Sequence, residues 1–86
     1  MIHELKIKEN YLHNLMIGIK KVEIRYNDRD YQAGDILSFW NRQEHGLPKK
    51  VHFRITHIHY GLGLEKGFIA LSVELQPKER DYGSGT

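Results

Sequence analysis

A glycine, a carboxylate and several cations stand close together in the segment Gly18-Ile19-Lys20-Lys21-Val22-Glu23-Ile24-Arg25. The glycine closes an amphipathic helical run, and the residues after it alternate like a strand. Side chains two apart on a strand point to the same face. We therefore expect Lys20, Glu23 and Arg25 to converge beside Gly18. One carboxylate between cations suits either the binding of a phosphate or nucleobase, or proton chemistry.

The three side chains have distinct possible roles. Arg25 can fork onto a phosphate or stack on a base, and Lys20 supplies a point charge. Glu23 either accepts a hydrogen bond from a base amino group or holds Arg25 in place. The alternative without function is an exposed cross-strand ion pair, which contributes about 0–1 kcal/mol.

The composition predicts one small soluble domain. The chain has 86 residues, of which 40% are hydrophobic and 28% charged, as in a globular protein. It contains no cysteine, which excludes a disulfide framework and a thiolate zinc site. No apolar run approaches membrane-spanning length and no signal-peptide pattern begins the sequence. We expect a cytoplasmic location, no membrane partner and no cofactor.

Positive charge is unevenly distributed along the chain. The formal net charge is only +2, but residues 1–25 and 49–60 carry an excess of lysine and arginine. These segments could be neighbours in space and attract anions together. Beyond the central motif, the cations that would extend a contact with RNA are Lys21, Lys49, Lys50 and Arg54. The alternative is a solvated strand face.

Hydrophobic periodicity predicts one helix among several strands. The expected strands span residues 2–7, 22–26, 36–41, 50–60 and 68–75, and the helix spans residues 9–17. In the second strand, Val22, Ile24 and Tyr26 form the apolar half of the alternation, and in the last strand Leu75 is expected inward. The apolar phase slips near Thr56-His57, which predicts a bulge there.

The same order of elements predicts the fold. Several short strands, turn signals and one helix favour a small mainly-β barrel with the helix covering one side, and an open α+β sheet is the alternative. The domain is expected over residues 1–76, followed by a disordered tail over residues 77–86.

The segment Gly18-x-Lys20-x-x-Glu23-x-Arg25 resembles the GxKxxExR signature of the ASCH superfamily. The wider resemblance is to a short uncharacterised bacterial and phage family within that superfamily, over residues 2–75. Further matching segments are His3–Ile7, Asn27–Asp30, Gly34–Leu37 and Gly67–Leu71. The resemblance implies a PUA-like β-barrel of about five to six strands with one helix after the first strand.

The resemblance also implies a function. It points to a monomeric RNA-binding or nucleotide-binding domain with a cleft where Lys20, Glu23 and Arg25 meet, bordered by His3. Some ASCH members are small amidohydrolases, but those place a threonine nucleophile where this chain has Glu23. Others are ribonucleases. The second hypothesis is therefore a hydrolase of a modified nucleoside or RNA, with Lys20 and Glu23 as candidate catalytic residues; a binding module without catalysis is favoured.

The remaining aromatic and histidine residues give weaker signals. Tyr31 and Tyr60 lie beside predicted turns and are candidates for stacking on bases, whereas Trp40 is expected to pack. His52, His57 and His59 are expected to be surface residues. No carboxylate stands at a spacing diagnostic of a metal site, so we expect no metal.

Overall fold

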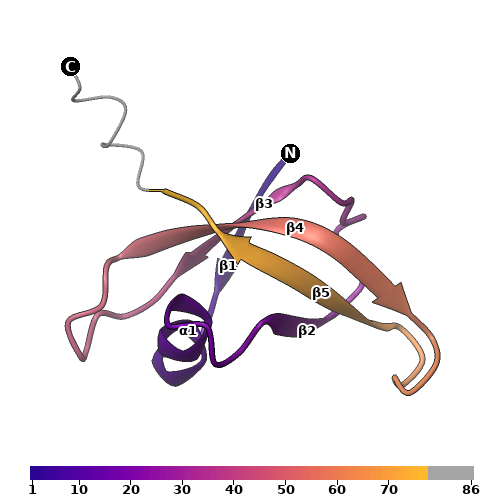
Figure 1. Ribbon diagram of the computed structural model, residues 1–86, viewed down its shortest axis with the longest axis horizontal. Coiled ribbons are helices and arrows are strands. Elements are labelled where there is room, and N and C mark those ends of the chain that lie inside the picture. The colour runs from indigo at the N-terminus through magenta and orange to yellow at the C-terminus, as the bar shows by residue number, and fades with distance from the viewer. Residues whose placement is uncertain (78–86) are drawn as a thin grey trace.

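The computed structural model describes residues 1–77, which form five strands and one helix (Figure 1). In chain order they are β1 (Ile2–Lys6), α1 (Glu9–Met16), β2 (Val22–Tyr26), β3 (Ile36–Trp40), β4 (Lys50–Tyr60) and β5 (Phe68–Leu75). The expected tail lies outside the described residues from residue 78 onward. Among residues 1–77, no helix has the length and apolar character needed to cross a membrane.

The five strands form a single curled sheet in the order β1-β3-β4-β5-β2. The β1–β3 pair is parallel and the other three pairs are antiparallel. β1 and β2 are therefore edge strands, and the sheet is a half-barrel rather than the closed barrel expected from the sequence. Figure 1 shows α1 beneath the curled sheet. The two edge strands lie at opposite ends of the strand order and do not pair with one another.

The core lies between the concave face of the sheet and α1. The helix contributes Leu12 and Leu15, and β4 contributes Val51, Phe53 and Ile55, all of them buried. The predicted bulge is confirmed, because the register of β4 against β5 shifts between Ile55 and His57. The alternation of apolar residues thus identified both the face of β4 that packs in the core and the position where the register of the strand shifts.

Several apolar residues lie differently from the expectation. Trp40 is 38% exposed and Leu75 is 45% exposed, because both stand at the ends of their strands. In β2 the whole phase is reversed: Ile24 is 54% exposed, whereas Glu23 is only 5% exposed. The charged half of β2 therefore faces the concave side of the sheet, and this places the first candidate site.

Candidate functional site

The predicted trio comes together where the two sheet edges approach each other. We call the gap between β1 and β2 the seam, and Lys20, Glu23 and Arg25 the seam cluster. The Arg25 Nε lies 3.1 Å from the Glu23 Oε2, and the Lys20 Nζ lies 3.5 Å from the Glu23 Oε1. The buried carboxylate thus faces a different cation with each oxygen, and the cluster as a whole keeps one net positive charge.

The end of α1 positions Lys20. Gly18 has a φ of +85°, a left-handed conformation that glycine adopts without steric cost. The chain turns back there, and the backbone N–H of Lys20 donates to the Asn14 carbonyl over 2.9 Å. The Lys20 ammonium then donates to the Val22 carbonyl and lies 5.3 Å from the centre of the Tyr11 ring. Its side chain remains 26% exposed.

Arg25 bridges the two sheet edges. Its Nη2 donates to the Lys6 carbonyl oxygen at the end of β1 over 2.9 Å, while its Nε donates to Glu23. The guanidinium also lies 5.7 Å from the centre of the buried Phe39 ring. Within residues 1–77 its Nη1 makes no hydrogen bond, and the side chain is 24% exposed. Arg25 is thus held in one orientation with donors left over.

His3 and Tyr31 lie in the interior of the half-barrel. Their ring centroids are 4.7 Å apart, and the His3 Nε2 lies 2.8 Å from the Asp35 Oδ2. His3 lowers the pKa of Asp35, and this exceeds the opposite effect of burial. Tyr31 is only 2% exposed, so its ring is not the platform for base stacking that the sequence suggested. Burial raises the pKa of Tyr31; the Arg25 charge acts in the opposite direction with a smaller effect, and the Glu23 charge adds slightly to the increase.

Lys50 and Arg54, two of the other predicted RNA contacts, pair with carboxylates outside the seam cluster. Lys50 pairs with Glu4 at 3.3 Å, and Arg54 pairs with Glu74 at 2.9 Å. β4 is the central strand and is separated from β1 by β3 and from β2 by β5, but the Lys50–Glu4 pair brings the two basic segments into contact at the β1 edge. Lys21 and Lys49 are exposed residues outside the strands.

A groove that the sequence did not predict lies between α1 and the loop after β3. This α1 groove has a volume of about 980 Å³. It is lined by residues 6–10, His13 and Asn14 on one side, and by Arg42, Glu44, His45 and Leu47 on the other. Lys6 belongs to both regions, because its carbonyl accepts the Arg25 hydrogen bond at the seam.

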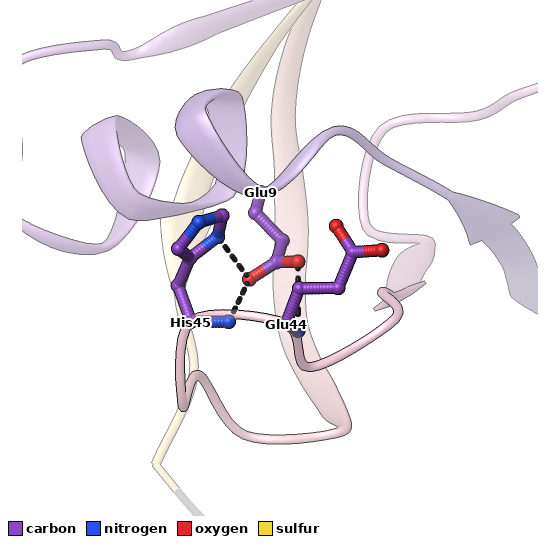
Figure 2. Close-up of side chains that lie close together, drawn as sticks. All are labelled: Glu9, Glu44 and His45. Carbon is purple, nitrogen blue, oxygen red and sulfur yellow. Dashed lines mark hydrogen bonds and ion pairs between the residues drawn. The ribbon is translucent and has the colours of Figure 1, made fainter.

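Glu9 fastens the loop to the helix, as Figure 2 shows. Its two carboxylate oxygens accept the backbone N–H groups of Glu44 and His45, each over 2.9 Å, and the His45 Nδ1 lies 3.3 Å away. Burial acts to raise the pKa of Glu9, but the backbone N–H groups and the His45 ring together bring this pKa below its ordinary value. The loop is therefore anchored by an ionised carboxylate at neutral pH.

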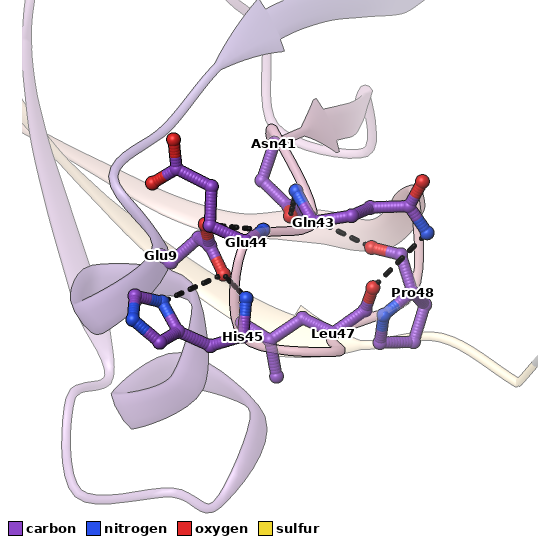
Figure 3. A network of polar contacts seen from close by, with 7 residues as sticks. All are labelled: Glu9, Asn41, Gln43, Glu44, His45, Leu47 and Pro48. Atoms are coloured by element: carbon purple, nitrogen blue, oxygen red, sulfur yellow. Dashed lines mark hydrogen bonds and ion pairs between the residues drawn. The ribbon is translucent and has the colours of Figure 1, made fainter.

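Asn41 orders the same loop from its other end. Its Oδ1 accepts the backbone N–H of Gln43 over 2.6 Å, and its Nδ2 donates to the Pro48 carbonyl over 2.6 Å (Figure 3). Gln43 has a φ of +59°, a left-handed conformation that is uncommon outside glycine. Its side chain donates to the Leu47 carbonyl. Internal bonds thus define the wall of the α1 groove without a ligand.

The comparisons place the chain in a family. Residues 2–73 match the family described as Domain of unknown function (DUF3850). The chain belongs to this family. No curated protein shows significant similarity to it.

Two solved structures share the fold of this family member. The crystal structure of hypothetical protein PH0355 from Pyrococcus matches with a TM-score of 0.65 and 20% sequence identity. The match covers 88% of this chain and 100% of that chain. The solution structure of protein PF0455 from Pyrococcus furiosus has a TM-score of 0.56 and 21% identity, with 87% and 97% covered. At these identities the likeness establishes the shared fold.

Most polar side chains that line the α1 groove have no protein partner. Of the lining side chains, only Glu9 and His45 form hydrogen bonds or ion pairs with residues 1–77. The ammonium groups of Lys6 and Lys8 lie 5.6 Å from the ring centres of Trp40 and Tyr11 respectively. The sequence feature that could have indicated this groove is the spacing of Asn10, His13 and Asn14, which places three polar side chains on one helix face.

One group of side chains in the described residues has the composition of a metal site. Ligand atoms of Glu9, Glu44 and His45 lie within 4.8 Å of one another. Both Glu9 oxygens already accept backbone N–H groups, and Figure 2 shows the Glu44 carboxylate pointing away from the His45 ring. These contacts account for the arrangement as an anchor of the loop.

Proposed function

We propose that the chain is an RNA-binding or nucleotide-binding domain, and that its half-barrel is of the PUA-like kind found in the ASCH superfamily. The seam cluster is the contact site in this proposal. It consists of the residues that match the GxKxxExR signature, and these residues meet at the open side of the sheet.

The observation that carries the proposal is the orientation of Arg25. Two of its nitrogens are bound within the protein, so the guanidinium is fixed before any ligand arrives. The Arg25 and Lys20 side chains remain partly accessible, at 24% and 26% exposed. Ordering a long side chain in advance reduces the entropy lost on binding. A fixed guanidinium beside a second cation suits a phosphate or the edge of a base.

The burial of Glu23 supports a role beyond folding. A carboxylate taken out of water is costly unless it is paired, and replacing a buried ion pair by apolar residues is often neutral or stabilising. β2 nevertheless directs Glu23 inward and leaves Ile24 and Tyr26 more than half exposed, at 54% and 57%. Glu23 acts in this proposal as the positioning residue that aims Arg25.

The hydrolase hypothesis receives no comparable support. A general base needs a carboxylate oxygen that can reach the proton of a water or substrate. Each oxygen of Glu23 instead faces a cation of the protein itself. A binding role uses the cluster in the arrangement that the structure has.

Fluorescence anisotropy with labelled single-stranded and hairpin RNAs tests the proposal. We expect binding at low salt, with a logarithmic salt slope of about −0.7 for each phosphate contacted on a single strand. Arg25→Lys keeps the positive charge but removes the planar guanidinium that can donate two hydrogen bonds to one group, and it is expected to weaken RNA binding about tenfold. The control is Lys66→Ala, which removes a charge from the loop between β4 and β5. If the folded protein binds none of these RNAs at low salt, the proposal is wrong.

A further inference from the structure

We infer that the α1 groove is a nucleotide subsite, which holds one nucleotide of the RNA strand whose neighbouring phosphate contacts the seam cluster. This inference rests on the proposed function and deepens it, because it assigns a second binding region that the signature residues do not include. The groove volume of about 980 Å³ lies near the upper end of the range of roughly 300–1,000 Å³ for small-ligand sites.

The lining of the groove offers a complement to each part of a nucleotide. Ile7 and Leu47 provide apolar surface for a base. Asn10 and Asn14 stand four residues apart in α1, so their amides share a face, and each offers both donors and an acceptor to a base edge. Arg42 supplies a guanidinium for a phosphate or for stacking on the base.

The charges of the groove favour an anionic occupant. Lys6, Lys8 and Arg42 form no ion pair within residues 1–77, although each contributes to the lining. Of the two lining carboxylates, Glu9 already accepts two backbone N–H groups and faces His45. Glu44 also lines the groove and forms no ion pair within residues 1–77. A ligand with a phosphate would therefore meet three cations against two lining carboxylates, one of which is already bound by backbone N–H groups.

The groove is formed before binding. Glu9 fixes the middle of the loop against α1, and Asn41 joins the two ends of the loop. The loop that carries Arg42 is therefore held in place by polar contacts, and the Arg42 side chain takes no part in them. A preformed wall lowers the ordering cost of a ligand.

Lys6 belongs to both the groove and the seam. Its carbonyl oxygen accepts the hydrogen bond from Arg25, and the same residue lines the α1 groove. The two regions therefore meet at the end of β1, within reach of a strand of a few nucleotides. This shared residue favours one RNA strand over two independent ligands.

Two measurements test the inference. In the first, a labelled single-stranded RNA of about five nucleotides is titrated with the protein and with Arg42→Ala, Asn14→Ala and the control Lys66→Ala. We expect the two groove variants to bind about five- to tenfold more weakly, with circular dichroism and unfolding midpoint unchanged. In the second, adenosine and uridine monophosphates are added to ¹⁵N-labelled protein, and the side-chain amide signals of Asn10 and Asn14 are expected to shift.

The outcomes separate this inference from the proposed function. If Arg25→Lys weakens RNA binding while both groove variants bind as the unaltered protein does, the groove inference is wrong and the proposed function stands. If no RNA binds but the monophosphates shift the Asn10 and Asn14 signals, the proposed function fails and the groove remains a nucleotide site. If neither RNA nor monophosphate has an effect, the groove inference is overturned.

Discussion

The seam cluster and the α1 groove use polar side chains in opposite ways. At the seam, Glu23 faces two cations, and Arg25 also donates to the backbone of another strand. In the groove, the side chains of Asn10, His13, Asn14 and Arg42 contact no polar group of residues 1–77. The first region uses most of its polar groups in contacts within the protein and leaves only part of the Arg25 guanidinium free, whereas the second keeps its hydrogen-bonding capacity unused.

This difference separates stability from recognition. A substitution at the seam removes internal bonds, so it changes the free energy of unfolding together with any binding. A substitution of an unpartnered groove side chain removes nothing that the folded chain uses. The groove is therefore the region where a contribution to binding can be measured without a change in the fold.

The largest effect is expected from Glu23→Ala. This change leaves Lys20 and Arg25 without their carboxylate, and we expect a loss of about 1–3 kcal/mol in the free energy of unfolding. The loss is expected to be small within this range if water solvates the two partly exposed cations once the carboxylate is gone. Urea denaturation followed by circular dichroism measures it. Glu23→Gln, which keeps the shape and one acceptor, is expected to lose less.

Asn14→Ala is the matched comparison in the groove. Because this side chain has no protein partner, the free energy of unfolding is expected to stay within about 0.5 kcal/mol of the original value. Equal losses of unfolding free energy in Glu23→Ala and Asn14→Ala would contradict the distinction between a region held by internal contacts and a region whose polar side chains have no protein partner.

A smaller and local effect is expected from Glu9→Gln. The neutral amide accepts hydrogen bonds more weakly than a carboxylate, so the backbone N–H groups of Glu44 and His45 are less well held. Amide hydrogen exchange at these two positions is expected to quicken on the order of tenfold. Exchange in β4 serves as the internal control. Unchanged exchange at Glu44 and His45 would mean that Glu9 does not anchor the loop.

The smallest effect concerns pH. The pKa of Glu9 and the pKa of Asp35 are both below their ordinary values of 4.5 and 3.8. A lowered pKa in the folded state means that the contact stabilises the fold above the ordinary value and is lost as the pH falls through the folded-state value. Both anchors are therefore expected to hold at pH 5. The backbone N–H of His45 donates to Glu9 and that of Gln32 donates to the Asp35 Oδ2 over 3.1 Å, so their amide shifts report the two titrations. Midpoints above the ordinary values would contradict this prediction.

Much of the sheet could be predicted from local patterns. In β4, Val51, Phe53 and Ile55 alternate with polar residues, and the change of phase near Thr56 identified the bulge. Gly18 marked the end of α1, and its φ of +85° explains why a glycine stands there. These features depend on residues adjacent in the sequence, and so the sequence displays them.

The orientation of β2 could not be predicted in the same way. Alternation shows that Ile24 and Glu23 lie on opposite faces, but not which of those faces is buried. The inward placement of Glu23 and Arg25 depends on a partner 19 residues earlier, the Lys6 carbonyl. Apolar periodicity alone favours the opposite phase, because it does not register that paired charges can be buried.

The α1 groove was missed for a related reason. The polar face formed by Asn10, His13 and Asn14 is visible in the sequence, but a polar helix face is usually solvated. This face becomes the wall of a groove because the loop after β3 packs next to it. Glu9 holds the loop there by binding the backbone of Glu44 and His45, which are 35 and 36 positions away in the sequence. No local pattern connects those two segments.

The pairing of the edge strands has a consequence for how the chain folds during synthesis. β2 is held to the sheet by β5, the last strand, although only a short helix and β1 precede it in the chain. Such non-local contacts slow folding, because long loops must close before they form. While the ribosome is still making residues 68–75, Glu23 and Arg25 have been synthesised but lack the strand that pairs with β2, so the seam cluster can assemble only after β5 has been made.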